Sequence, residues 1–202
     1  MAKALQKMNI NPTEIKAVFI THMHSDHVGG LVNTGMTQQN AEENTRNYFP
    51  NATVYLAKTE YDAWKTDNSR ASLKAFLEPY QPEQLSLFDY ETKLTGPFGT
   101  VIPHKKEGHT PGHTVYEMQA SANEKIYFVG DIAHAADLQI PMPEYCARFD
   151  MDPPKAVLSR KDVFKNYKGS LFGAHFPFPG NIKVNHLVSE DKETFNYQLI
   201  RP

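Results

Sequence analysis

Hydrophobic and polar positions along the chain follow two periods, one typical of strands and one typical of helices. Short apolar runs rich in β-branched and aromatic residues predict strands within 14–20, 52–58, 100–120, 125–131 and 170–176, and the alternating tail at 181–200 predicts a hairpin. Helical spacing or helix-start signals predict helices at 2–10, 59–64, 69–80 and 159–167. The stretch 37–49 is compatible with a helix or an exposed loop, and 141–154, with four prolines, predicts an irregular surface loop. Strands that alternate with helices indicate an α/β fold.

Composition narrows the class of protein. The 202 residues, 40% of them hydrophobic, are enough for one core, so we expect a single domain over 1–202. A formal net charge of -2 without a basic stripe argues against nucleic-acid and membrane-surface partners. No apolar run is long enough to span a membrane, and the first residues show no signal peptide, so the chain as written is expected to be cytoplasmic. The single cysteine, Cys146, excludes an internal disulfide and a cysteine-rich metal knuckle.

The stretch "THMHSDHVGG" at 21–30 concentrates metal-ligating side chains. His22, His24 and Asp26 alternate, so in an extended segment they project to one side, whereas His27 points elsewhere unless the chain turns. Imidazole and carboxylate suit zinc, and also manganese, iron or cobalt. Because no thiolate is near and the cluster offers more ligands than one closed ion needs, it indicates a catalytic, dinuclear site.

Further candidate ligands follow later predicted strands. Asp131 ends "KIYFVGD", and His175 follows "SLFGA", just as His22 follows "KAVFI". The turn "GHTPGHT" adds His109 and His113. Each residue alone is a weak signal, but strand ends are where α/β scaffolds place their chemistry. His104 and His186 are interpreted as surface or strand residues rather than ligands.

Taken together, "THMHSDHVGG", "GHTPGHT", "FVGD" and "GAH" resemble the metallo-β-lactamase superfamily from Lys16 onward. Within it, "GHTPGHTVY", "GDIAHAADLQ" and "AHFPFPG" resemble the branch that includes methyl parathion hydrolase and lactonase-like enzymes. The resemblance implies an αβ/βα sandwich and a metal-dependent hydrolase.

The resemblance also implies a ligand set for two divalent ions, with zinc as the first choice. His22, His24 and His113 would bind one ion. Asp26, His27 and His175 would bind the second, and Asp131 would bridge the two. His109 would lie beside the ions without binding them. Cys146 has no counterpart among the ligands and is interpreted as structural or incidental.

The implied mechanism is attack by hydroxide on a carbonyl carbon or a phosphorus, since two ions about 3.5–4 Å apart lower the pKa of a shared water. Asp26 and Asp131 can accept or pass a proton. His134 would overhang the site where related lactonases place a tyrosine, and it would either steer the substrate oxygen or simply pack. Met142, Tyr145 and Phe149 are candidate pocket walls for a hydrophobic small-molecule substrate, or loop-packing residues.

The N-terminal side departs from the family pattern. Only 21 residues precede His22, enough for one helix and one strand, whereas the superfamily supplies several strands there. We expect the written sequence to begin at an internal methionine of a longer protein; a deliberately shortened chain and a minimal variant completed by a partner chain are alternatives. A lost signal peptide would make the protein periplasmic or secreted, and an exposed sheet edge would favour a homodimer.

Several functions share these motifs. The leading hypothesis is hydrolysis of an ester, a lactone or a phosphotriester. The alternatives are a β-lactamase, a glyoxalase II-like thioesterase, a mononuclear iron sulfur dioxygenase, and, outside the enzymes, an inactive metal-binding fragment.

Overall fold

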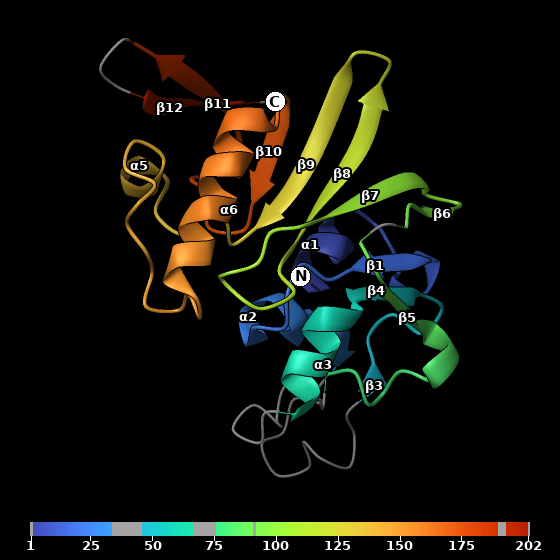
Figure 1. Ribbon diagram of the computed structural model, residues 1–202. Coiled ribbons are helices and arrows are strands. Elements are labelled where there is room, and N and C mark those ends of the chain that lie inside the picture. The colour runs from blue at the N-terminus through green and yellow to red at the C-terminus, as the bar shows by residue number, and fades with distance from the viewer. Residues whose placement is uncertain (1, 34–45, 67–75, 91, 190–192, 202) are drawn as a thin grey trace. The chain divides into compact units, whose positions relative to one another are not determined.

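The computed structural model describes residues 2–33, 46–66, 76–90, 92–189 and 193–201 (Figure 1). The chain divides into two compact units, an N-terminal unit, Met1–Asp89, and a C-terminal unit, Tyr90–Pro202. The prediction of a single domain over the whole chain therefore stays a prediction. In the part of the chain that the structure describes, no helix combines the length and hydropathy of a transmembrane span.

The N-terminal unit is built around three parallel strands in the order β1-β4-β5. Its elements are α1 (Ala2–Lys7), β1 (Ala17–Phe19), α2 (Ser25–Val28), β2 (Val32–Asn33), β3 (Arg46–Asn47), β4 (Thr53–Ala57), α3 (Lys58–Thr66) and β5 (Leu85–Phe88), with short 3-10 turns at Pro12–Glu14, Gly29–Leu31 and Pro82–Gln84. Alternate side chains of β4 are buried, and Val54 and Leu56 join Met23 and Trp64 in one apolar cluster. This core holds the end of β1, where the histidine-rich stretch begins.

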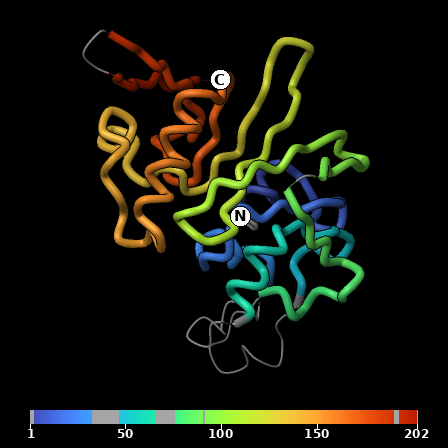
Figure 2. The backbone as a smooth tube through the Cα atoms, in the orientation of Figure 1, coloured from blue at the N-terminus to red at the C-terminus, as the bar shows by residue number. Residues whose placement is uncertain are grey.

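The C-terminal unit contains a seven-stranded sheet in the order β12-β11-β10-β9-β8-β7-β6 (Figure 1). Its elements are β6 (Leu94–Gly96), β7 (Gly99–Lys105), β8 (Thr114–Ser121), β9 (Glu124–Gly130), α5 (Ala136–Gln139), α6 (Pro153–Asn166), β10 (Ser170–Gly173), β11 (Asn181–Val188) and β12 (Glu193–Leu199). Among the described strands of this sheet, β9 and β10 alone pair in parallel, because α5 and α6 lie between them along the chain, as the backbone trace in Figure 2 shows. Val163 and Phe164 of α6 pack with Val129, Leu171 and Ile182 of the strands.

The α/β class and most predicted elements are confirmed, including the strands on either side of "GHTPG" and the C-terminal hairpin. The predicted loop at 141–154 is wrong at its end, since α6 begins at Pro153. Asp152 caps the helix by accepting a hydrogen bond from Lys155 N at 3.2 Å, and proline is well suited to the first turn because that turn needs no N–H donor.

Two helix predictions fall largely outside the described residues. Most of 37–49 and residues 69–75 belong to these parts of the chain. Of the predicted helix at 69–80, the described residues 76–80 form turns and a bend, so no helix is present there.

Candidate metal centre

Strand pairing in the C-terminal unit collects three of the predicted ligands. Because β9 and β10 run in parallel, Asp131 and His175, which follow them, lie at the same end of the sheet. The antiparallel register pairs Tyr116 with Phe128, so His113, three residues before the first, lies opposite Asp131, three residues after the second. The backbone N–H of Asp131 donates a hydrogen bond to His113 Nε2 at 3.1 Å. These three candidate ligands thus lie next to strand ends, where the sequence placed them; that they bind metal stays a prediction.

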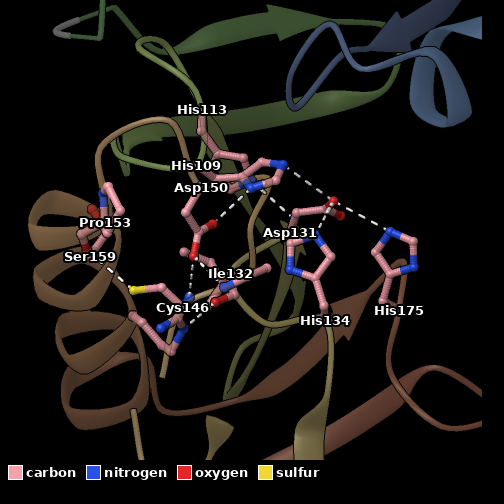
Figure 3. A network of polar contacts seen from close by, with 12 residues as sticks. His109, His113, Asp131, Ile132, His134, Cys146, Asp150, Pro153, Ser159 and His175 are labelled. Carbon is pink, nitrogen blue, oxygen red and sulfur yellow. Dashed lines mark hydrogen bonds and ion pairs between the residues drawn. The ribbon is translucent and has the colours of Figure 1, made fainter. Parts of the chain in front are cut away.

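One carboxylate oxygen of Asp131 is the focus of this cluster (Figure 3). Its Oδ2 lies 3.1 Å from His134 Nε2 and 3.3 Å from both His109 Nε2 and His175 Nε2. Asp131 itself is only 2% exposed. A buried carboxylate surrounded by imidazoles is a donor set that fits zinc and similar divalent ions. His134 lies beside Asp131, and its expected place over a metal site stays a prediction.

His109 bridges two carboxylates and is itself buried. Its Nδ1 lies 2.9 Å from Asp150 Oδ1, while its Nε2 faces Asp131. Carboxylates accept hydrogen bonds, so this arrangement favours an imidazolium that donates from both nitrogens. Burial alone would lower the pKa of His109, but the contacts with Asp131 and Asp150 outweigh it and raise the pKa above 6.5. The expectation that His109 lies beside the ions without binding them stays a prediction.

Asp150 is held ionised by the same contacts. Burial would raise the pKa of its carboxyl, whereas the hydrogen bond from His109 and the charge of Arg160 lower it below 3.8. Sequence reasoning assigned no role to Asp150 or Arg160. Nothing in the sequence signals this pairing, because Asp150 lies 41 positions from His109 and in a proline-rich segment.

Gly108 shapes the turn that presents His109. Its φ is +127°, and a Cβ built there would lie 2.0 Å from the backbone nitrogen of Ala156 in α6. Its carbonyl accepts a hydrogen bond from Asp152 N at 2.8 Å. Only glycine fits this backbone conformation and this close approach without strain.

In the N-terminal unit, the histidine-rich stretch is extended only at its start. Ile20 N donates to Tyr55 O at 3.0 Å, which prolongs the β1–β4 pairing, but α2 begins at Ser25. The prediction that His22, His24 and Asp26 alternate in one extended segment is therefore wrong at Asp26. The helical turn instead brings the ring of His27 to 4.0 Å from that of His22, centroid to centroid.

Glu60 of α3 supports this stretch from behind. It is fully buried, and its Oε1 accepts hydrogen bonds from Met23 N at 2.9 Å and from Trp64 Nε1 at 2.5 Å. The Trp64 ring in turn contacts the His24 ring edge to face, with centroids 5.5 Å apart. The sequence suggested only that acids near Thr59 favour the start of a helix, so this role of Glu60 was missed.

The remaining predicted residues lie in varied surroundings. Asp26 is 59% exposed, and its Oδ2 lies 3.4 Å from His27 Nε2. Met142, Tyr145 and Phe149 are exposed, as residues that could line a pocket would be. Three residues were expected not to bind metal. Cys146 is exposed, His104 forms an ion pair with Glu117, and His186 forms one with Glu193.

The two sets of candidate ligands each fit a divalent ion by their chemistry. The N-terminal unit supplies His22, His24, Asp26 and His27, and the C-terminal unit supplies His113, Asp131 and His175. Within the C-terminal unit, ligand atoms of Asp131, His134 and His175 all lie within 4.8 Å of one another. Oxygen and nitrogen donors at this spacing suit a borderline or hard transition-metal ion.

Comparison with solved structures identifies the fold. The chain is similar to hydrolase AbOPH of the β-lactamase superfamily, with a TM-score of 0.81 and 27% identity over 98% of this chain and 69% of that one. It is also similar to AidC, a dizinc quorum-quenching lactonase, with a TM-score of 0.79 and 28% identity over 99% of this chain and 70% of that one. A probable metal-dependent hydrolase from Staphylococcus aureus shares the fold at 22% identity and a TM-score of 0.63, over 84% of this chain and 57% of that one.

These similarities confirm the metallo-β-lactamase fold and the enzyme class, metal-dependent hydrolase. No curated protein sequence matches the chain. A family model described as "Anti-Pycsar protein Apyc1" matches residues 1–145. The chain therefore belongs to the Anti-Pycsar protein Apyc1 family and has the metallo-β-lactamase fold.

Proposed function

We propose that this chain is a dinuclear-metal hydrolase that cleaves an ester, a lactone or a phosphotriester. The observation that carries the proposal is the buried Asp131 carboxylate, whose Oδ2 faces three imidazole nitrogens at 3.1–3.3 Å. Similarity to a dizinc lactonase at 28% identity supports the same reading. It also agrees with the resemblance to the branch of methyl parathion hydrolase and lactonase-like enzymes.

The proposed ligands are those implied by the family resemblance. One ion is assigned to His22, His24 and His113, and the other to Asp26, His27 and His175, with Asp131 shared between them. When bound, two divalent ions supply Lewis-acid chemistry and make hydroxide available from water near neutral pH. Zinc is the proposed metal, because the donors are imidazole and carboxylate, and because AidC, to which the chain is similar, is a dizinc lactonase.

The chain's own side chains have further roles in this proposal. Asp26, more than half exposed, can accept a proton from the reacting water and release it to solvent. His134, with Nε2 3.1 Å from Asp131 and a ring only 19% exposed, can donate a hydrogen bond to a substrate oxygen. Phe149 and the neighbouring Tyr145 offer exposed apolar surface for a hydrophobic substituent.

The test combines a substrate panel with one variant. Wild-type protein loaded with zinc should hydrolyse at least one carboxylic ester, lactone or phosphotriester. Replacing Asp131 by Ala should remove most of that turnover, because the shared ligand is lost. Full turnover by the Asp131→Ala variant would refute the mechanism.

The panel also separates the alternatives. Turnover confined to a β-lactam or a thioester would favour the β-lactamase or glyoxalase II-like alternative. One iron per chain with thiol oxidation would indicate a sulfur dioxygenase. Bound metal without turnover of any substrate would favour an inactive metal-binding fragment.

A second candidate function is favoured by the family match over residues 1–145. The family description, anti-Pycsar, suggests action against Pycsar. Expression of the wild-type chain in cells that carry Pycsar should then weaken the effect of Pycsar. Expression of the Asp131→Ala variant should leave the effect of Pycsar unchanged. If the wild-type chain and the Asp131→Ala variant weakened the effect of Pycsar equally, this function would not depend on the metal chemistry.

We further propose a small-molecule substrate and a homodimer, without a nucleic-acid or membrane partner. The net charge of -2 supports the exclusion of nucleic acid. Light scattering of the purified chain should give twice the mass of 22.9 kDa, and a monomer mass would contradict the dimer.

A further inference from the structure

Four buried side chains of the C-terminal unit form a row that begins at Asp131. Figure 3 labels the first three of them, Asp131, His109 and Asp150. Asp131 Oδ2 lies 3.3 Å from His109 Nε2, and His109 Nδ1 lies 2.9 Å from Asp150 Oδ1. Asp150 Oδ2 then accepts a hydrogen bond from Arg160 Nη2 at 3.2 Å. The four side chains are at most 3% exposed. Polar contacts of 2.9–3.3 Å thus link the four buried side chains in sequence.

Arg160 uses its other donors on the segment that follows Asp131. Its Nε donates to Ile132 O at 2.7 Å, and its Nη1 donates to Pro143 O at 2.8 Å and to Tyr145 O at 2.7 Å. The Arg160 guanidinium therefore hydrogen-bonds to both ends of the segment 132–145. It also binds Asp150, which connects it to the row that begins at Asp131. The planar fork of arginine suits such a junction, and the single ammonium of lysine does not.

The same segment is held internally by Gln139. Its Oε1 accepts hydrogen bonds from His134 N at 2.7 Å and Ala135 N at 3.0 Å, and its Nε2 donates to Tyr145 O at 2.9 Å. His134 is thereby fixed at the backbone while its ring faces Asp131. The segment and the row together determine where the Asp131 carboxylate and the His134 ring can lie.

Buried ion pairs contribute little net stability compared with apolar residues of similar volume, because desolvation opposes their attraction. A buried row of linked polar side chains that ends in the Asp150–Arg160 ion pair is thus better explained by orientation than by stability. We propose that Asp150 and Arg160 are positioning residues, which act through His109 to hold the Asp131 carboxylate toward His134 and His175. The proposal rests on the proposed function only in taking Asp131 as a metal ligand.

The variants separate charge, hydrogen bonding and geometry. Asp150→Asn keeps an acceptor for His109 Nδ1–H but loses the charge, and Asp150→Ala loses both. Arg160→Lys keeps the charge but loses the fork. The matched control is Lys161→Met. Lys161, the next residue of α6, also pairs with this segment, at 2.6 Å from Glu144 Oε1, but both side chains are exposed and neither belongs to the row.

The first measurement is zinc affinity, by competition with a chelator. Loss of a partner that orients a metal ligand typically lowers affinity about 10–100-fold. Asp150→Ala and Arg160→Lys should show such a loss, Asp150→Asn a smaller one, and Lys161→Met none. The second measurement uses metal-free protein, in which the ¹⁵N signals of the His175 ring report on Asp131. These signals should shift in both Asp150 variants and stay unchanged in Lys161→Met.

The outcomes distinguish this proposal from the proposed function. If the wild-type chain binds no zinc, the proposed function fails, and the His175 signals alone decide the positioning role. If Arg160→Lys does not fold, Asp150→Asn and Asp150→Ala decide it. Folded Asp150 variants with wild-type His175 signals, and with wild-type zinc affinity wherever zinc binds, would overturn the proposal.

Discussion

Glu60 is the residue on which the backbone between His22 and His24 depends, since it accepts the hydrogen bond from Met23 N. Replacing Glu60 by Leu should lower the free energy of unfolding by about 2–4 kcal/mol, because two buried N–H donors lose their acceptor. Glu60→Gln keeps an oxygen that can accept a hydrogen bond, so it should lower the free energy of unfolding by only about 1 kcal/mol. Urea unfolding followed by the fluorescence of Trp64, the single tryptophan, measures both variants. Equal midpoints for the two would contradict this role.

Gly108 gives a second prediction for a single residue. Alanine there should destabilise the protein by about 3 kcal/mol or more, because φ is +127° and the new Cβ would overlap the backbone of α6. Gly29→Ala is the matched control, since a Cβ at Gly29 meets no atom within 4 Å and its φ is negative. Thermal unfolding should show a large loss only at Gly108. A similar melting temperature for both variants would refute the steric argument.

Sequence patterns were most informative for residues whose chemistry is rare. Three histidines in "HMHSDH" and a histidine or aspartate at successive strand ends pointed to the candidate ligands. Glu60, Asp150 and Arg160 were missed because charged residues are common and their partners are set by tertiary pairing. Asp26 was misplaced because alternation along the chain cannot show that a helix begins at Ser25.

At the scale of elements, Glu117 links three neighbouring strands of the C-terminal sheet. From β8 it contacts Lys125 Nζ of β9 at 2.6 Å and His104 Nε2 of β7 at 2.8 Å. Burial would raise the pKa of the Glu117 carboxyl, but the hydrogen bonds from Lys125 and His104 outweigh it and lower the pKa below 4.5. The carboxylate therefore stabilises these strands wherever it is ionised.

The pH dependence follows from that lowered pKa. The contribution of Glu117 is fully present above the unfolded value of 4.5 and is lost as the pH falls through the lower folded value. At about pH 7, Glu117→Gln should be less stable than wild type by about 1 kcal/mol, allowing for the partial exposure of Lys125. Urea titrations at decreasing pH should show the difference disappear in acid. A constant difference would contradict the assignment.

Periodicity predicted the strands well, because alternate burial in a sheet leaves a direct pattern in the sequence. The start of α6 was harder, since prolines are typical of loops and also of first helical turns. Here the prolines lie in a first helical turn, because the Asp152 side chain caps the helix. The pairing of β9 with β10 was not predicted, because strand order depends on contacts between distant segments.

At the scale of the whole molecule, the α/β class and the metallo-β-lactamase fold were predictable from the motifs and are confirmed. The Anti-Pycsar protein Apyc1 family was not predicted, because the motifs used are common to the whole superfamily. The division into two units was also not visible in the sequence. Composition constrains only the size of the core and does not show where the chain divides.

We propose that the histidine and aspartate ligands assigned above hold two metal ions in each chain. Elemental analysis of zinc-loaded protein after removal of free metal measures this number directly. We expect close to two ions per chain, and the same number for His186→Gln, because His186 pairs with Glu193 on the C-terminal hairpin. One ion per chain, or none, would contradict it.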